Sequence, residues 1–245
     1  MPSVINYDEF WKTARLSNRR KHPLRRVVDA YRLPRHRLLE IGPGTRPTLP
    51  IDGSFFLDNA PSAIERLRLQ GGIGAVGDAN KTLPYEDAFF DLVCAFDVLE
   101  HLENDEKACR EVSRILKPGG IFIISVPMNQ RHWTAFDQFV GHWRRYEPQP
   151  LKRLVQGSGF EMEQVFISSS PLYSAFISFP LTKWLASLVI KASPLFLRQL
   201  GFLEECFSTQ VMQCYVRPLR KALSGLDSLP SSIHGACLVC RKPSY

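Results

Sequence analysis

The sequence predicts an α/β fold built around a mostly parallel sheet. Between residues 36 and 127, short apolar runs of strand length alternate with polar or helix-like segments, which is typical of βαβ units. The runs are nearly continuous in apolar residues, as expected for strands buried on both faces. The expected strands are 37–41, 55–58, 73–77, 91–96 and 121–126.

The clearest predicted helix covers residues 103–116, with its apolar side chains on one face. It should end at Lys117-Pro118-Gly119-Gly120, because lysine suits a helix C-terminus and the Pro-Gly-Gly run stops the helix. Further along, the sequence predicts a short helix, a strand and a last strand, at 148–157, 160–167 and 236–241.

Composition divides the chain into four segments. Residues 1–37 are predicted to form a basic helical arm and residues 38–170 the core. Residues 171–229 are apolar and helix-like and are expected to form a helical insertion or cap, and residues 230–245 return to complete the core. The apolar stretches are interrupted, so no membrane-spanning helix is expected.

The net charge of +7 comes from the arm. Residues 1–37 hold ten Lys/Arg and three Asp/Glu, a balance of +7, whereas the remaining residues hold 21 of each. Such an arm suits nucleic acid, anionic lipid or an acidic substrate. The plainer interpretation is a solvated, partly helical arm that covers the sheet edge.

The six cysteines are scattered, which suits a reducing compartment. Cys237 and Cys240 have CxxC spacing within an apolar strand-like run, where residues three apart face opposite sides. We therefore expect buried thiols and no metal site. The N-terminus lacks the basic start and apolar core of a signal peptide, and a cytoplasmic protein is expected.

Residues 38–50, LLEIGPGTRPTLP, look like a nucleotide-binding turn without its helix. Gly42 and Gly44 follow a strand, but Arg46 stands where a dinucleotide site has its third glycine. Pro50 and Gly53 leave room for little more than one helical turn. A pyrophosphate would lose the helix N-terminus that anchors it. A nucleoside without phosphates, such as S-adenosylmethionine, would lose nothing.

Three acidic residues, Glu40, Asp58 and Asp78, fall at the carboxyl ends of successive expected strands. Open α/β sheets bind ligands at that edge. The Asp58 carboxylate has two acceptor oxygens suited to the vicinal ribose hydroxyls, and Asp78 can accept from the adenine amino group. The three residues together predict a nucleoside site.

The sequence resembles the class I S-adenosylmethionine-dependent methyltransferases of the small-molecule type. Successive motifs of that family are matched by LLEIGPGT, FFLDNAP, AVGDANKTLPYEDAFFDLVCAFDVLEHL and VSRILKPGGIFIISVP, over about residues 38–127. The resemblance is weaker over 141–165 and fades over 171–229. It implies a Rossmann-like, seven-stranded, mostly parallel sheet flanked by helices, with the helical insertion before the last strand. It also implies an enzyme that uses S-adenosylmethionine and releases S-adenosylhomocysteine.

In that family the glycine turn lies under the methionine moiety, the Asp58 position binds ribose and the Asp78–Ala79 position binds adenine. Thr45 or Arg46 could contact the cofactor carboxylate in place of the missing glycine. The predicted cofactor-binding residues are therefore Glu40, Gly42, Gly44, Thr45, Asp58, Asn59, Asp78, Ala79, Phe96 and Asp97.

Methyl transfer from a sulfonium needs an aligned acceptor and, for a hydroxyl, a base. His142 and His101 are the candidate catalytic residues, because imidazole titrates near neutrality; each could instead be structural. Arg144, Arg145 and Tyr146 are predicted to bind an acidic or sugar-like substrate, unless they only position the next helix.

The predicted function is O-methylation of a small-molecule acceptor that is hydrophobic, glycosylated or lipid-linked, with peripheral membrane contact through residues 171–229 and the basic arm. Nucleic-acid methylation is disfavoured, because Phe96-Asp97-Val98-Leu99 replaces the Asn/Asp-Pro-Pro-aromatic motif that grips a flipped base. A third alternative is a non-catalytic, methyltransferase-like binding protein.

Overall fold

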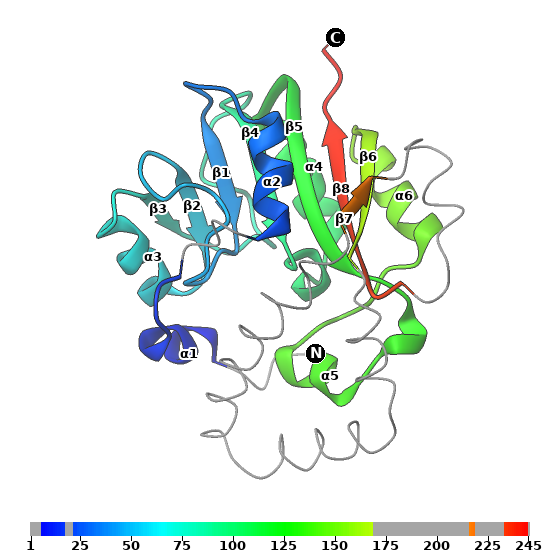
Figure 1. Cartoon of the computed structure of the whole chain (residues 1–245), viewed down its shortest axis with the longest axis horizontal. Helices are drawn as coiled ribbons and strands as arrows, with labels where there is room; N and C mark the ends of the chain where they lie inside the picture. Colours follow the sequence, from blue (N-terminus) through cyan, green and yellow to red (C-terminus); the bar gives the residue numbers. More distant parts are fainter. Residues whose placement is uncertain (1–5, 18–21, 169–215, 219–232, 245) are drawn as a thin grey trace.

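A computed structural model describes residues 6–17, 22–168, 216–218 and 233–244. The sheet contains eight strands in the order β3-β2-β1-β4-β5-β8-β6-β7 (Figure 1). Four of the neighbouring pairs are parallel, and β8 runs antiparallel between β5 and β6. The predicted Rossmann-like, mostly parallel sheet is confirmed. The strands are β1 Leu38–Ile41, β2 Phe55–Asp58, β3 Ile73–Val76, β4 Phe90–Phe96, β5 Leu116–Pro127, β6 Glu161–Ser168, β7 Val216–Pro218 and β8 Gly235–Arg241.

The short strand β7 corrects one part of the sequence-based prediction. Residues 216–218 were expected to be helical, but they pair antiparallel with β6, from Phe166↔Pro218 to Ser168↔Val216. They supply partners to backbone groups that would otherwise lie on an open sheet edge. The rest of the predicted insertion lies outside the described residues.

The predicted helices of the core are confirmed, although α4 is shorter than the predicted 103–116 at both ends. Helix α6 (Pro148–Gly157) has the expected bounds, and α4 (Asp105–Ile115) begins where the Asn104 side chain accepts from the Lys107 amide at 2.9 Å. The α4 prediction ran too far: β5 already begins at Leu116, so Lys117 belongs to the strand.

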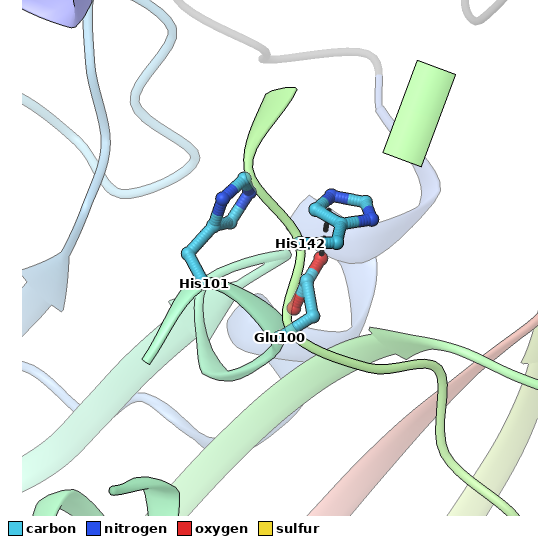
Figure 2. Close-up of side chains that lie close together, drawn as sticks. All are labelled: Glu100, His101 and His142. Carbon is cyan, nitrogen blue, oxygen red and sulfur yellow. Dashed lines mark ion pairs between the residues drawn. The ribbon is translucent and has the colours of Figure 1, made fainter. Parts of the chain in front are cut away.

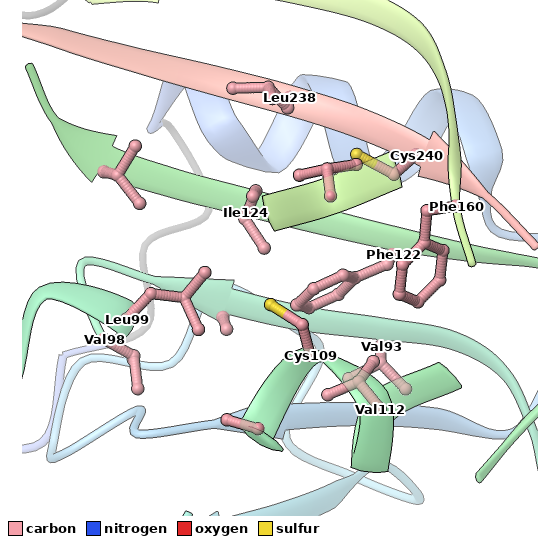
Figure 3. Packing of buried hydrophobic residues seen from close by; sticks show 14 of the residues in the cluster. Val93, Val98, Leu99, Cys109, Val112, Phe122, Ile124, Phe160, Leu238 and Cys240 are labelled. Carbon is pink, nitrogen blue, oxygen red and sulfur yellow. The ribbon is translucent and has the colours of Figure 1, made fainter. Parts of the chain in front are cut away.

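Two apolar clusters cover the two faces of the sheet. Helices α4 and α6 pack on one face, where Val112 of α4 and Phe122 of β5 belong to the same buried cluster (Figure 3). Helices α2 (Pro23–Tyr31) and α3 (Pro61–Arg68) pack on the other. Cys237 and Cys240 are buried in different clusters, as the strand geometry predicted.

No helix follows β1: residues 42–54 contain none, as the prolines predicted. Helix α2 covers the sheet face instead, with Leu24, Val27 and Val28 buried. Arg25 of α2 donates to the carbonyl of Thr48 in the helix-free segment at 2.9 Å. The interpretation of residues 1–37 as a solvated arm at the sheet edge is therefore wrong for α2, because this helix belongs to the core.

Replacing Leu24 by alanine should destabilise the fold by about 2–3 kcal/mol, near the lower end of the range for buried leucines. Leu24 is 6% exposed within the apolar cluster under α2. The matched control is Leu33→Ala, because Leu33 follows the same helix but is 62% exposed. Urea unfolding checks the difference, and equal effects of the two substitutions would contradict the placement of α2 in the core.

Four further helical segments lie near the carboxyl ends of the parallel strands. Helices α1 (Tyr7–Thr13) and α5 (Ala135–Val140) lie at that end of the sheet, at the bottom of Figure 1, and η1 (Leu99–His101) follows β4. A second 3₁₀ turn, η2 (Gln130–His132), follows β5. Within the described ranges, no helix is both long and apolar enough to cross a bilayer.

Candidate cofactor and acceptor site

The turn after β1 needs glycine at two positions. Gly42 and Gly44 have φ angles of +66° and +53°, in the left-handed region. A Cβ on Gly42 would lie 2.6 Å from Val98 Cγ2, and one on Gly44 would lie 2.5 Å from the indole of Trp11. Backbone conformation and close neighbours therefore both exclude a side chain at either position.

Glu40 holds the helix-free segment in place. Its carboxylate accepts from the Thr48 amide at 3.0 and 2.9 Å and from the Leu49 amide at 2.8 Å. The side chain is buried. Glu40, a predicted cofactor-binding residue, therefore binds backbone amides of this segment. In a helix, these amides would instead donate to the helix's own carbonyls.

Asp58, at the end of β2, joins the glycine turn to the next loop. Its Oδ2 accepts from the Gly44 amide at 2.8 Å and its Oδ1 from the Ala60 amide at 2.9 Å. Burial raises the pKa of Asp58, and hydrogen bonds from backbone amides oppose this shift. Each carboxylate oxygen has capacity for a further hydrogen bond. The structure therefore brings two predicted cofactor-binding residues, Asp58 and Gly44, into direct contact.

Helix α1 covers the same turn. Trp11 lies against Gly44, and Asp8 accepts from the Ser62 amide of α3 at 2.8 Å. Ser17, just after α1, donates its amide to the Thr45 carbonyl at 2.9 Å. The Thr45 side chain is fully buried, and its Oγ1 has no hydrogen-bond partner among the described residues. A polar ligand atom next to the turn would satisfy this hydroxyl.

The remaining predicted cofactor residues lie at the carboxyl ends of β2, β3 and β4. After β3, Asp78 accepts from the Asn80 amide at 2.9 Å, and Ala79 lines a small apolar cavity with Leu99 of η1. After β4, Phe96 is buried and Asp97 is exposed with φ +53°. Ser125 Oγ donates to the Asp97 carboxylate at 2.9 Å and stabilises this conformation, which costs a non-glycine residue about 1–3 kcal/mol. Asn59 is exposed beside Asp58.

Asp137 of α5 is the centre of a buried polar network. His142 Nδ1 lies 2.8 Å from Asp137 Oδ1, and Arg145 donates to both carboxylate oxygens at 2.8 and 3.0 Å. The Thr134 amide and hydroxyl also donate to Oδ2. Burial alone would raise the pKa of Asp137, but the hydrogen bonds from His142 and Arg145 and the Arg145 charge hold it well below its usual range.

His142 lies beside His101 and Glu100. The two imidazole rings meet edge to face with centroids 4.5 Å apart, and His142 Nε2 is 3.9 Å from Glu100 Oε1 (Figure 2). Burial, with a smaller contribution from His142, lowers the pKa of His101 to about 4. Burial and the nearby Asp97 charge raise the pKa of Glu100 well above its usual value. The structure therefore brings both predicted catalytic histidines together.

The three predicted substrate-binding residues make internal contacts. Arg145 is bound to Asp137. Arg144 Nη1 pairs with Asp105 Oδ2 at 2.7 Å, and the Tyr146 hydroxyl donates to the same oxygen at 2.7 Å. These contacts hold the segment after α5 against the start of α4. They favour the alternative in which the motif positions secondary structure, because the groups expected to meet substrate bind protein atoms.

Sequence reasoning missed Asp137 and Glu100 as members of the site. Asp137 had a local signal, since Thr134 and Asp137 have capping-box spacing and form that motif. Nothing local indicates that Asp137 also binds Arg145 and His142, which approach it across the left-handed turn at Gly141.

Known proteins resemble this chain over the same region. A family model described as a methyltransferase domain matches residues 39–124. A probable S-adenosylmethionine-dependent methyltransferase of Mycolicibacterium smegmatis is 35% identical over 85 residues, which are 33% of this chain and 32% of that protein. A demethylmenaquinone methyltransferase of Leptospira interrogans is 30% identical over 134 residues, 48% of this chain and 54% of that protein. The chain thus spans a third to about half of the length of these relatives.

A solved structure of a S-adenosylmethionine-dependent methyltransferase from Thermotoga maritima, titled a possible histamine N-methyltransferase, has the same fold. The TM-score is 0.57 at 17% identity, over 89% of this chain and 86% of that one. The turn, the strand-end acids and the family match agree on one assignment. Residues 39–124 match the methyltransferase-domain family, and the fold is similar to that of a solved S-adenosylmethionine-dependent methyltransferase.

Proposed function

We propose that the chain transfers the methyl group of S-adenosylmethionine to an oxygen of a small-molecule acceptor. The observation that supports this most is the contact between the Asp58 carboxylate and the Gly44 amide, 2.8 Å apart at the carboxyl edge of the sheet. In this position Asp58 would accept from the ribose hydroxyls, and Ala79 and Leu99 would lie against adenine. The unpartnered Thr45 hydroxyl would meet the carboxylate or the amino group of the methionine moiety.

Trp11 sets a condition on binding. Its indole lies on Gly44, where the methionine moiety would pass. Binding therefore requires Trp11 either to move aside or to stack along the ligand. Two contacts hold α1 in place: Asp8 accepts from the Ser62 amide, and the Tyr7 hydroxyl donates to the Val140 carbonyl at 2.8 Å. Once Trp11 has moved, the helix would therefore cover the bound cofactor.

Methyl transfer here is an in-line displacement. The acceptor hydroxyl gives its proton to the imidazole of His142 or His101, its oxygen forms a bond to the methyl carbon, and the electron pair of the C–S bond returns to sulfur as S-adenosylhomocysteine leaves. His142 and His101 are the groups proposed to act on the acceptor side. His101 is the last residue of η1, which follows the cofactor-lining end of β4, and the His142 ring lies against the His101 ring.

The proposed acceptor is hydrophobic, glycosylated or lipid-linked. The sequence of residues 171–229 is rich in Leu and Phe, which suits an apolar acceptor. The relative from Leptospira is named for demethylmenaquinone. The positive charge of residues 1–37 supports an acceptor that is bound to an anionic membrane. Two of these arginines, Arg25 and Arg32, pair with Asp29, which reduces the positive charge that they offer to a membrane. Flotation with anionic vesicles at low salt tests this part of the proposal, and a wholly soluble protein would contradict it.

The reaction is tested by incubating the full chain with S-adenosylmethionine and a panel of hydrophobic and glycosylated alcohols, phenols and amines. Mass spectrometry is expected to find a methylated alcohol or phenol together with S-adenosylhomocysteine. Products confined to amines would contradict O-methylation. A methylated RNA or DNA in a parallel reaction would instead support the nucleic-acid alternative.

A further inference from the structure

Three potential metal ligands converge beside the proposed cofactor site. Glu100 and His101 come from η1 and His142 follows α5, and their ligand atoms all lie within 4.8 Å of one another. Figure 2 shows the two imidazole rings flanking the same space above the Glu100 carboxylate. Two sequence-distant segments therefore supply two nitrogens and one carboxylate to a single point.

The Glu100 carboxyl is deeply buried, and one of its two oxygens lacks a hydrogen-bond partner among the described residues. The residue is 1% exposed, and the oxygen without a partner is Oε2. Oε1 reaches His142 Nε2 only at 3.9 Å, too far for a hydrogen bond. A buried carboxyl in this state costs free energy unless a cation or donor meets it. A bound cation would remove this cost.

The histidines are oriented as metal ligands are. Asp137 holds His142 through Nδ1 at 2.8 Å, so the proton is placed on Nδ1 and the Nε2 lone pair faces His101 and Glu100. Arg145 in turn fixes Asp137. The backbone at Gly141 and Val140 hydrogen-bonds the His101 ring. Metal-binding histidines characteristically donate their other nitrogen to a carboxylate or a carbonyl in this way.

We propose that Glu100, His101 and His142 bind one divalent transition-metal ion of the zinc or manganese type. Imidazole nitrogens with a carboxylate suit these ions. Metal–ligand bonds of about 2.0–2.2 Å place ligand atoms roughly 3–3.5 Å apart, so the three side chains must close by about an ångström. In this role His142 is a ligand and Asp137 a positioning residue, and the general-base role of His142 is replaced.

The metal would leave coordination positions for water or for an acceptor oxygen, and it would lower the pKa of a hydroxyl bound there. That last assignment rests on the proposed function. Metal binding itself does not, because neither cofactor nor acceptor is needed for it. No metal was expected from the sequence, where only the CxxC spacing was considered.

Full-length protein treated with a chelator is titrated with Co²⁺ followed by absorption, and with Zn²⁺ followed by calorimetry. One equivalent should bind at micromolar strength or tighter. The cobalt spectrum should show ligand-field bands without a thiolate charge-transfer band, because the ligands are nitrogen and oxygen. Failure of the unsubstituted protein to bind, or a thiolate band, overturns the proposal.

Variants locate the site. Glu100→Gln and His142→Ala should each weaken binding by on the order of 100-fold, and Asp137→Asn by roughly 10–100-fold. The matched controls are Glu103→Gln, exposed three residues after Glu100, and His36→Asn, beside the amino ends of β4 and β5; neither should change the affinity. Circular dichroism confirms folding. Undiminished binding in both Glu100→Gln and His142→Ala overturns the proposal, whereas metal binding without methyl transfer counts against the proposed function alone.

Discussion

Replacing Asp58 by asparagine is expected to weaken binding of S-adenosylhomocysteine by about 100-fold or more, as measured by calorimetry. The carboxylate would accept from two ribose hydroxyls, and hydrogen bonds to a charged group contribute about 1.5–3 kcal/mol each. Losing both amounts to about 3–6 kcal/mol, and each 1.36 kcal/mol is a factor of ten. Asparagine offers one acceptor oxygen in place of two, and its NH₂ group faces donors.

The control for this variant is Asp52→Asn, because Asp52 is an exposed carboxylate in the loop that precedes β2. The affinity of the Asp52→Asn protein for S-adenosylhomocysteine should match that of the unsubstituted protein. Asp58 also accepts from the Gly44 and Ala60 amides, so thermal unfolding is measured in parallel to separate lost binding from lost structure. A folded Asp58→Asn protein with unchanged affinity would show that ribose does not bind at Asp58.

Replacing Asp137 by alanine is expected to lower the free energy of unfolding by about 3–5 kcal/mol, because the change leaves a buried charge without its partner. Asp137 is fully buried, and the Arg145 side chain that it pairs with is 9% exposed. The Thr134 amide and His142 lose their acceptor as well. Urea unfolding measures the effect.

Asp87→Ala provides the comparison. Asp87 pairs with Arg114, but its side chain is 78% exposed, so its loss should cost less than about 1 kcal/mol. Adding Arg145→Met to the Asp137→Ala protein should recover part of the stability, because the second change removes the unpaired charge. A loss below 1 kcal/mol for Asp137→Ala, with no recovery in the double variant, would contradict the account of this network.

The sheet was predictable because its strands are buried apolar runs separated by clear turn residues. The bounds of β2 and α6 agree with the sequence to the residue, and the prolines after Gly44 correctly excluded a helix between β1 and β2. The charged sequence around α2 hid its role. Two arginines separate buried Leu24 from buried Val27 and Val28, so the net charge of the segment masks its narrow apolar face.

The candidate site was only partly predictable. The strand-end positions of Asp58, Asp78 and Asp97 follow from parallel topology alone, since such strands end at one edge. The contacts of Glu40 and Arg145 do not, because each depends on a loop path that the sequence does not specify. Glu100 was passed over for a related reason: only the folded chain shows that its carboxyl is buried between two histidines.

The central claim is that the turn after β1 binds a nucleoside without phosphates. The most direct test is calorimetric titration of the unsubstituted chain with S-adenosylhomocysteine and, separately, with NAD. One S-adenosylhomocysteine is expected to bind per chain at micromolar strength, and no binding of NAD is expected, because no helix N-terminus is present at the turn to hold a pyrophosphate. Tight binding of NAD with none of S-adenosylhomocysteine would contradict it.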